Sequence, residues 1–328
     1  MTSDADTVIQ TTRLGKRFGG VDAVNGIEFQ VRHGDVYGFL GPNGSGKTTT
    51  IRLLLGLISP TRGGCSIFGE PVLPGAAALR RVGALVERPA FYPYLSAVDN
   101  LLLYAAARGI DRDRATRLVG PALERVGLTE AARRKLAGYS TGMRQRLGIG
   151  TALLDGPELI VLDEPTNGLD PGGVVEVRQL IASLAREGAT IFLSSHVLTE
   201  VEQLCDRVAI LVRGRIVSEG STRDMLREGE RLFLRFETGD EAGRAATLLN
   251  QRDIAFERLD DAPALLVSAP ASEGARVNRL LGEAGLYPGE LSVRRPSLES
   301  VFLELTGERD VEPTASAPDA PAAPATVT

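Results

Sequence analysis

The chain has 328 residues, of which 43% are hydrophobic and 24% are charged, and its formal net charge is −5 at pH 7. This length suggests roughly two domains of about 150 residues each. The negative charge excludes binding to polyanions through bulk electrostatics, and no apolar run reaches the ~18 residues that a membrane-spanning helix requires. The polar residues 1–8 are unlike a secretory signal. Cys65 and Cys205 fit a reducing compartment and are also compatible with one disulfide bond.

Strand and helix patterns alternate over the first 220 residues, which is typical of a mainly parallel α/β fold. The first strands are predicted at 8–14, 23–31 and 35–40. A helix is predicted over 47–57, directly after a glycine-rich turn.

That turn matches GxxxxGK[ST], the pattern of a phosphate-binding loop. Glycines let backbone N–H groups point inward around anionic oxygens, and the following helix adds its positive N-terminus. Lys47 would approach the β- and γ-phosphates, and the hydroxyl of Thr48 would bind Mg²⁺. An ordinary glycine-rich turn is the alternative, but the required strand and helix flank this one; no GxGxxG fingerprint for a dinucleotide occupies it. The loop residues are Gly41, Pro42, Asn43, Gly44, Ser45, Gly46, Lys47, Thr48 and Thr49.

Residues 90–154 show a different pattern, with little strand signal. Helices are predicted at 99–108, 112–126 and 141–154. We interpret this region as a helical insertion into the α/β core.

The apolar run 159–163 ends in two carboxylates, Asp163 and Glu164. Because neighbouring residues on a strand point in opposite directions, Asp163 can face Mg²⁺, through water, while Glu164 turns toward the γ-phosphate. Hydrolysis needs a group that orients and polarises water, and Glu164 suits that role. A surface strand that simply ends in acids is the alternative, and the phosphate loop argues against it.

A short buried strand is predicted at 190–194, just before His196. Strand ends meet where an open α/β sheet binds its ligand, so His196 could hydrogen-bond the γ-phosphate and Glu164. A lone histidine is more often structural, and His33, in a turn, is given no chemistry. The remaining predicted elements here are a helix at 172–186 and a hairpin of strands 208–212 and 215–217.

A second unit begins at about residue 231. Its order of elements predicts a small βαββαβ-like α+β domain that ends with a helix start at 296–299. The segment 308–328 is rich in alanine and proline, and we expect it to be disordered because it offers little apolar surface to bury. The predicted strands are 232–236 and 265–267, and the predicted helices are 240–251 and 272–284.

The sequence Tyr139-Ser140-Thr141-Gly142-Met143-Arg144-Gln145 precedes Asp163. With the phosphate loop, it closely resembles the signature sequence of the ATP-binding-cassette (ABC) ATPases. The resemblance covers residues 14–220. It implies a P-loop NTPase fold, with a RecA-like α/β core, an antiparallel β part and a helical subdomain, plus the small C-terminal α+β domain. The implied domains are 1–225, with the helical subdomain at about 90–154, and 231–307.

The resemblance also implies roles for further residues. The signature would contact ATP held by the partner subunit through Ser140, Thr141, Gly142 and Met143. Asp170, in a sequence like the family's D-loop, would lie at the dimer contact. Phe18 is similar to the aromatic residue that stacks on adenine, with a core phenylalanine as the alternative. Glu87 stands where the family has glutamine, and we expect it to remain a Mg²⁺ ligand.

Residues 83–87 with Phe91-Tyr92-Pro93 resemble the bacitracin/lantibiotic-type and daunorubicin-type exporters, and so does the segment 295–303. The aromatic cluster around Tyr92 and Tyr94 could receive a cytoplasmic helix of a membrane partner, or it could simply be core packing.

These resemblances predict an exporter ATPase for drugs, antibiotics or similar hydrophobic or amphipathic compounds. ATP and Mg²⁺ would be its cofactors. It would form an ATP-dependent homodimer at the cytoplasmic face of the membrane, with a separately encoded transmembrane permease and no nucleic acid. One alternative is a soluble ABC ATPase acting on nucleic acid or ribosomes, but the chain has no long heptad run and no basic stripe. A P-loop kinase would leave the signature unexplained.

Overall fold

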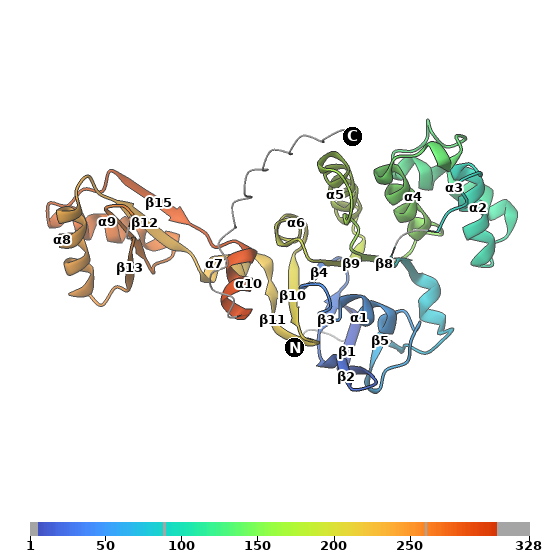
Figure 1. Ribbon diagram of the computed structural model, residues 1–328, viewed down its shortest axis with the longest axis horizontal. Helices are drawn as coiled ribbons and strands as arrows, with labels where there is room; N and C mark the ends of the chain where they lie inside the picture. Colours follow the sequence, from blue (N-terminus) through green and yellow to red (C-terminus); the bar gives the residue numbers. More distant parts are fainter. Residues whose placement is uncertain (1–5, 88–89, 260, 307–328) are drawn as a thin grey trace, which may run out of the picture.

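We describe the fold from a computed structural model, in which residues 6–87, 90–259 and 261–306 are placed (Figure 1). Two sheets form the centre, a group of helices lies at one end, and a smaller unit with its own sheet lies at the other end. None of the helices within these ranges combines the length and apolar character that a membrane crossing requires. The segment 308–328 lies outside the described residues, so its expected disorder stays a prediction.

The first sheet is antiparallel and is built around the long strand β1 (Thr7–Phe18). The single strand predicted at 23–31 is wrong, because the structure divides it into β2 (Val21–Ile27) and β3 (Gln30–Arg32). These strands pair with opposite ends of β1, which bends at register shifts beside Gly15, so one straight partner could not follow it. The unpredicted strands β5 (Arg62–Ile67) and β6 (Glu70–Pro71) complete the sheet.

The second sheet contains β4 (Val36–Leu40), β7 (Val82–Leu85), β8 (Leu159–Asp163), β9 (Thr190–Ser195), β10 (Arg207–Val212) and β11 (Arg215–Ser221). Their spatial order is β11-β10-β4-β9-β8-β7. All neighbours run parallel except β11, which pairs antiparallel with β10 through the predicted hairpin. The carboxyl ends of β4, β9, β8 and β7 therefore meet at one edge of the sheet, where such folds bind ligands.

Four helices each follow a strand of this second sheet along the chain. They are α1 (Lys47–Leu54) after β4, α5 (Pro171–Arg186) after β8, α6 (Leu198–Leu204) after β9 and α7 (Thr222–Glu228) after β11. α1 ends before the predicted residue 57, because Gly56 adopts φ +64° and the N–H of Leu57 donates back to the carbonyl of Arg52 at 2.9 Å. This is a Schellman-type ending, which uses glycine for its left-handed residue.

The helical group comprises α2 (Ala97–Ala107), α3 (Arg112–Arg125) and α4 (Thr141–Leu153), within one or two residues of the prediction. Side-chain caps begin all three helices. Ser96 and Asp99 form a capping box on α2, Asp111 caps α3 and Ser140 caps α4. Short 3-10 turns, η2 (Ala77–Arg81) and η3 (Leu136–Gly138), precede β7 and α4.

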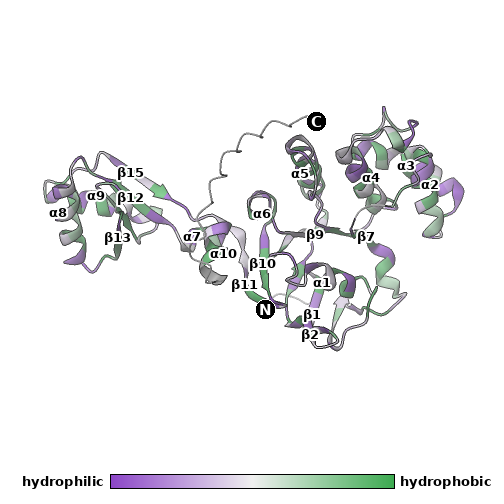
Figure 2. Ribbon diagram, in the orientation of Figure 1, coloured by the Kyte–Doolittle hydropathy of each residue, from purple (hydrophilic) through white to green (hydrophobic). Residues whose placement is uncertain are grey.

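The parallel sheet is buried on both faces. On β4, Val36 and Leu40 belong to the core beneath α5, α6 and the helical group, whereas Tyr37 and Phe39 face the core shared with α1 and the antiparallel sheet. The apolar runs of the central strands, such as β10, appear green in Figure 2. Burial on both faces explains why these strands read as continuous apolar runs in the sequence.

The smaller unit follows the predicted βαββαβ order and has a separate hydrophobic core. It consists of β12 (Arg231–Arg235), α8 (Gly239–Asn250), β13 (Phe256–Leu259), β14 (Ala264–Val267), the 3-10 turn η4 (Ala271–Glu273), α9 (Gly274–Glu283) and β15 (Glu290–Arg294). Its strands lie antiparallel in the order β13-β14-β12-β15, the split βαβ arrangement. The exact domain limits stay a prediction.

The chain then returns to the larger unit through α10 (Leu298–Thr306), as Figure 1 shows. Leu298 is fully buried and belongs to the core beneath α5 and α6. Its N–H donates to Glu202 Oε2 on α6 at 3.0 Å. The smaller unit is therefore tied to the larger one both by the α7–β12 connection and by α10.

Candidate functional site

The glycine-rich loop between β4 and α1 fits closely against neighbouring backbone. A Cβ atom at Gly41 would lie 2.3 Å from the carbonyl oxygen of Leu211, and one at Gly46 would lie 2.3 Å from that of Ala23. Gly46 also has φ +110°, which other residues rarely adopt. The glycines thus allow the path that leads into the N-terminus of α1, whose first N–H groups have no helical partners. The exposed residues of the loop are Pro42, Asn43 and Gly44.

Four hydroxyl groups lie in the loop and in the first turn of α1, and that of Thr50 is bonded to the carbonyl oxygen of Gly46. Ser45 Oγ is buried and makes no hydrogen bond to any part of the chain that the structure describes. A buried polar atom of this kind costs about 1–3 kcal/mol unless something satisfies it. Thr48 and Thr49 are half-buried and begin α1 with Lys47. The loop therefore offers polar groups suited to a ligand rich in oxygen atoms.

Lys47 is folded inward, with only 5% of its side chain exposed. Its ammonium group donates to the carbonyl oxygens of Gly41 at 2.7 Å and Pro42 at 3.3 Å. The same group forms an ion pair with Glu164 Oε1 at 3.1 Å. The cation therefore lies between the glycine-rich loop and the end of β8.

Glu164 connects two of the predicted catalytic groups. Its other carboxylate oxygen, Oε2, lies 2.6 Å from His196 Nδ1. Glu164 has φ +48°, and its N–H bonds to Ser194 through both the carbonyl oxygen and the side-chain oxygen. This unusual backbone turn directs the carboxylate toward Lys47 and His196, so the structure brings all three predicted groups together.

Asp163 is 5% exposed and is held by a residue of the neighbouring strand. Ser194 Oγ donates to Asp163 Oδ1 at 2.5 Å, and the sheet register places these two residues opposite each other. Ser194 also accepts the N–H of Glu164, so one hydroxyl positions both acids. We call Lys47, Asp163, Glu164, Ser194 and His196 the carboxyl-edge cluster.

Glu87 follows β7 at the same edge, but it lies apart from that cluster. Its side chain is 60% exposed and is paired with Arg52 of α1. The residue has φ +62°, so the chain turns sharply here. Positions 88 and 89 lie outside the described residues.

Phe18, at the end of β1, presents a half-exposed ring. Lys16 Nζ lies 5.1 Å from the centre of that ring. A core role is therefore excluded for Phe18, and the exposed ring is available to stack on a planar group.

The predicted signature forms the N-terminus of α4. Ser140 Oγ accepts the N–H of Met143 at 3.1 Å, and a Cβ at Gly142 would lie 3.6 Å from the Cα of Gly173 in α5. Asp170 caps α5 by accepting the N–H of Gly173 at 3.2 Å. We call residues 140–143 together with Asp170 the serine tip. A groove of about 490 Å³ runs along it and is lined by Ser140, Thr141, Gly142, Gly168, Asp170, Gly172, Gly173 and Glu176.

The structure thus gathers the predicted site residues into two groups. Within the described residues, no hydrogen bond or ion pair joins the serine tip to the glycine-rich loop or to the carboxyl-edge cluster. The polar contacts of the tip are local caps. Each group offers its own set of donors for anionic oxygens.

Comparison with known proteins decides the family. The sequence model described as "ABC transporter" matches residues 24–167. The bacitracin transport ATP-binding protein BcrA of Bacillus licheniformis is 43% identical over 304 residues, covering 92% of this chain and 98% of that protein. The chain belongs to the ABC transporter family. The daunorubicin resistance ATP-binding protein DrrA3 of Streptomyces coeruleorubidus is 36% identical, covering 93% of this chain and 97% of that protein.

Solved structures agree with this ABC assignment. An ATP-binding subunit of an ABC transporter is 32% identical, with a TM-score of 0.59 over 67% of this chain and 92% of that chain. The predicted P-loop NTPase fold and the resemblance to bacitracin- and daunorubicin-type proteins are therefore confirmed. As an ATP-binding subunit of this family, the chain is an ATPase. Such subunits work with transmembrane permease subunits.

Three positioning contacts of this ABC cassette escaped the sequence analysis. One indication of Ser194 was present in the sequence, because this polar residue lies at the end of a predicted buried strand. Its bonds to both Asp163 and Glu164, however, depend on the register between β8 and β9. Thr166 donates to Glu200 of α6 at 2.5 Å, a contact between distant segments that no local pattern indicates. Arg52 of α1 pairs with Glu87, two residues after the end of β7, and the two positions are distant in the sequence.

Proposed function

We propose that this chain is the motor subunit of an exporter. Two copies bind two ATP molecules between them, close, hydrolyse the nucleotide and reopen, and the closing movement drives a separate permease at the cytoplasmic face of the membrane. The division of the candidate ATP contacts into the carboxyl-edge cluster and the serine tip supports this proposal. A second copy of the chain would place its serine tip against the glycine-rich loop of the first copy.

ATP would occupy the glycine-rich loop, with residues 41–49 around its phosphates. The buried, unpartnered hydroxyl of Ser45 and the N-terminus of α1 fit an anion at this place. Phe18 would stack on adenine with its half-exposed ring. Lys47 would exchange its contacts with the Gly41 and Pro42 carbonyl oxygens for the β- and γ-phosphates.

The donors near the loop fit Mg²⁺, which prefers hydroxyl, carboxylate and water oxygens. Thr48, Asp163 and Glu87 would hold the ion. The described residues contain no group of three histidine, cysteine or acidic side chains able to enclose a metal ion, so phosphate and water would complete the shell. When bound, the ion would neutralise charge on the phosphates.

Glu164 would act as the general base that polarises the attacking water, and His196 would hold its carboxylate through Nδ1. In the structure the carboxylate is also paired with Lys47. When Lys47 turns to phosphate, Glu164 loses that ion pair, and its carboxylate oxygen can then accept a hydrogen bond from the attacking water. Nucleotide binding would therefore free the base for the water.

The serine tip would complete the site of the partner subunit. The N-terminus of α4 carries partial positive charge and presents Ser140, Thr141, Gly142 and Met143, and Asp170 would contact the partner beside them. In a dimer with two-fold symmetry, each tip would complete one site, so both sites would close at the same time.

Export of drugs or antibiotics is the substrate class that we propose. The support is that BcrA and DrrA3, named for bacitracin transport and daunorubicin resistance, align along nearly their whole length with this chain. Tyr92 and Tyr94 are 52% and 62% exposed, with ring centres 5.7 Å apart, and would receive a permease helix. For the alternative acting on nucleic acid or ribosomes, we expect negligible binding at physiological salt.

The variant Glu164→Gln tests the proposal, because it keeps the shape of the side chain but removes the base. We expect ATP-stabilised dimers by light scattering and turnover lowered by about 10²–10³-fold. Glu28→Gln, an exposed acid with the same change of charge, serves as the control and should behave as wild type. Dimers that form only without nucleotide would contradict the proposal.

A further inference from the structure

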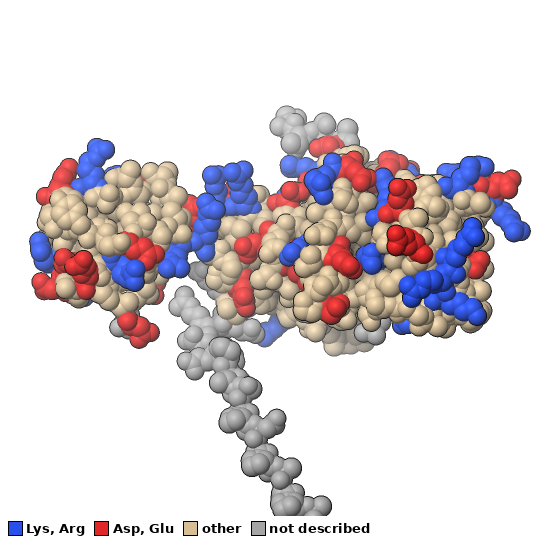
Figure 3. Space-filling model, turned by 90° about the horizontal axis from the view of Figure 1, so that it is seen from above, with Lys and Arg blue, Asp and Glu red and all other residues tan. Residues whose placement is uncertain are grey.

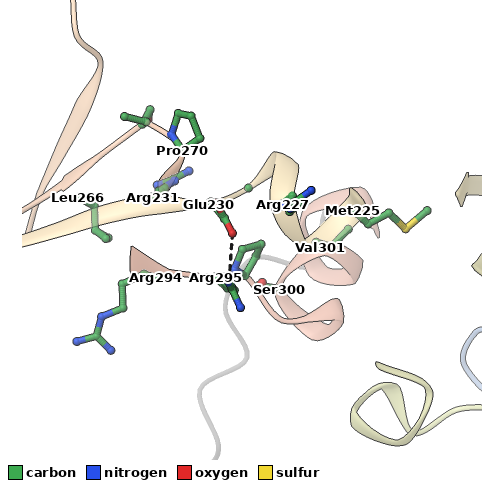
Figure 4. A pocket seen from close by; sticks show the side chains of 14 residues that line it. Met225, Arg227, Glu230, Arg231, Leu266, Pro270, Arg294, Arg295, Ser300 and Val301 are labelled. Carbon is green, nitrogen blue, oxygen red and sulfur yellow. Dashed lines mark hydrogen bonds and ion pairs between the residues drawn. The ribbon is translucent and has the colours of Figure 1, made fainter. Parts of the chain in front are cut away.

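A cavity of about 850 Å³ lies at the neck between the cassette and the smaller unit (Figure 4). The two crossings of the chain, from α7 to β12 and from β15 to α10, form its walls. They meet closely, because a Cβ at Gly229 would lie 2.7 Å from Pro296 Cγ. Its lining includes Arg227, Glu230, Arg231, Arg294 and Arg295.

The cavity is rich in arginine, and one acid holds its walls together. The side chain of Glu230 is only 8% exposed; it pairs with Arg295 at 3.0 Å and accepts the N–H of Ala271 at 3.2 Å. These donors hold the pKa of Glu230 below its ordinary value, with the Ala271 hydrogen bond as the largest cause. Glu230 therefore stays anionic and is fully engaged by the neck itself.

The other three guanidinium groups are less fully paired. Arg231 pairs with Glu257 at 2.8 Å. Arg227 acts on Glu230 only through space, and neither Arg227 nor Arg294 forms an ion pair with any side chain that the structure describes. Arg294 lies 4.6 Å from the centre of the Phe233 ring. The sheet register also places Arg231 directly opposite Arg294 on neighbouring strands, an unfavourable arrangement of like charges.

An anion at the neck would relieve that repulsion. Planar guanidinium groups bind phosphate, sulfonate and carboxylate oxygens through paired hydrogen bonds. Beside the arginines, the lining includes apolar side chains, among them Leu266, Pro270 and Val301. Basic side chains also gather at the neck in the view from above (Figure 3). The lining suits an organic molecule that joins an anionic group to an apolar body.

The neck is connected to the candidate active site through α10 and α6. Ser300 and Val301 of α10 line the cavity, and Leu298 at the start of the same helix binds Glu202 on α6. α6 begins two residues after His196, and its Glu200 accepts a hydrogen bond from Thr166, which lies two residues after Glu164 in the chain. A ligand that shifts α10 would thus act on the segments that carry His196 and Glu164.

We propose that the neck cavity is a regulatory site for an organic anion with an apolar body, whose binding changes the rate of ATP hydrolysis. The proposal goes beyond the motor function and does not depend on which compound is exported.

Anilinonaphthalene sulfonate is a suitable probe, because it joins a sulfonate to aromatic rings and fluoresces when bound. With the full-length protein and saturating ATP, we expect one neck site per chain and a changed turnover on binding. The variant Arg227→Ala/Arg294→Ala should weaken this binding at least tenfold and abolish the effect on turnover. The control Arg244→Ala/Arg279→Ala removes two exposed arginines from α8 and α9 with the same change of charge, and should resemble wild type.

Two further experiments test whether the anionic group is needed and whether the ligand comes from solution or from a membrane. Phenylnaphthylamine, which lacks the sulfonate, should not distinguish the arginine variant from wild type. Displacement of the probe by octyl phosphate would place the ligand in solution, and displacement only by phosphatidylglycerol vesicles would place it in a membrane; either supports the proposal. Equal probe affinity in both double variants, displacement by neither competitor, or bound probe with unchanged turnover would overturn it.

Discussion

The carboxyl-edge cluster and the serine tip differ in how far one chain completes them. In the carboxyl-edge cluster, Glu164 contacts both Lys47 and His196. Ser194 bonds to both acids, Asp163 and Glu164. In the serine tip, Ser140 and Asp170 only cap their own helices, beside an open groove. The comparison teaches that the first group is assembled by folding of one chain, whereas the proposed dimer would complete the second with a partner surface.

The largest effect is expected from Lys47→Ala, which removes the buried cation of the carboxyl-edge cluster. We expect turnover to fall by about 10³-fold, because the phosphates lose their charged donor and Glu164 loses its partner. Steady-state ATP hydrolysis measures the loss. Lys135→Ala, at an exposed lysine, should leave turnover unchanged; equal losses in both variants would break the comparison.

The variant Ser140→Ala tests whether the serine tip acts on the nucleotide of its own chain or on that of the partner. We expect turnover to fall by about 10²-fold, while ATP binding to the isolated chain stays near wild type, since in the proposed dimer the tip serves the partner's nucleotide. Loss of the helix cap alone would cost about 1 kcal/mol of stability. Ser221→Ala removes an equivalent cap from α7 and controls for that loss. Weakened binding of ATP to the monomer would place the tip in the same chain's site.

Ser194→Ala tests whether support of the two acids matters for catalysis. Asp163 loses its hydroxyl donor, and the N–H of Glu164 loses one of its two acceptors on Ser194. We expect turnover to fall by about tenfold and the free energy of unfolding to fall by about 1–3 kcal/mol. Ser183→Ala, which removes a hydroxyl bonded within α5, should change neither strongly. Reduced stability with full activity would show that Ser194 is merely structural.

The smallest effect is expected from Glu87→Gln, which restores the residue type that the family resemblance implies. An amide oxygen can replace the carboxylate oxygen as a ligand, so Mg²⁺-dependent turnover should stay within about tenfold, or 1.4 kcal/mol. Arg52→Gln, which removes the partner of Glu87, is the informative companion. Complete loss of turnover in Glu87→Gln would show that this residue has a different role.

The sequence predicted much of the fold because the central strands are apolar runs and the longer helices have helical periodicity. The mainly parallel sheet, and the closeness of the strand ends that carry Glu164 and His196, followed from rules for α/β sheets. The division of 23–31 into two strands could not be read locally, because it depends on the bend of β1.

The site was predicted less completely than the fold. Motif residues were found by type and spacing, but their supports come from tertiary neighbours. Ser194 positions two acids through strand register, and Arg52 reaches Glu87 across two elements. The arginines of the neck are distant in sequence and meet only because two chain crossings lie side by side. No pattern in a single segment indicates such a juxtaposition.

One measurement tests the central claim most directly: the ATPase activity of a mixture of Lys47→Ala and Ser140→Ala chains. Each variant alone lacks one half of both sites, but a mixed dimer would contain one intact site, formed by Lys47 of one chain and Ser140 of the other. For random two-fold pairing, we predict recovery of about a quarter of wild-type turnover. A mixture as inactive as the separate variants would contradict a site shared between two chains.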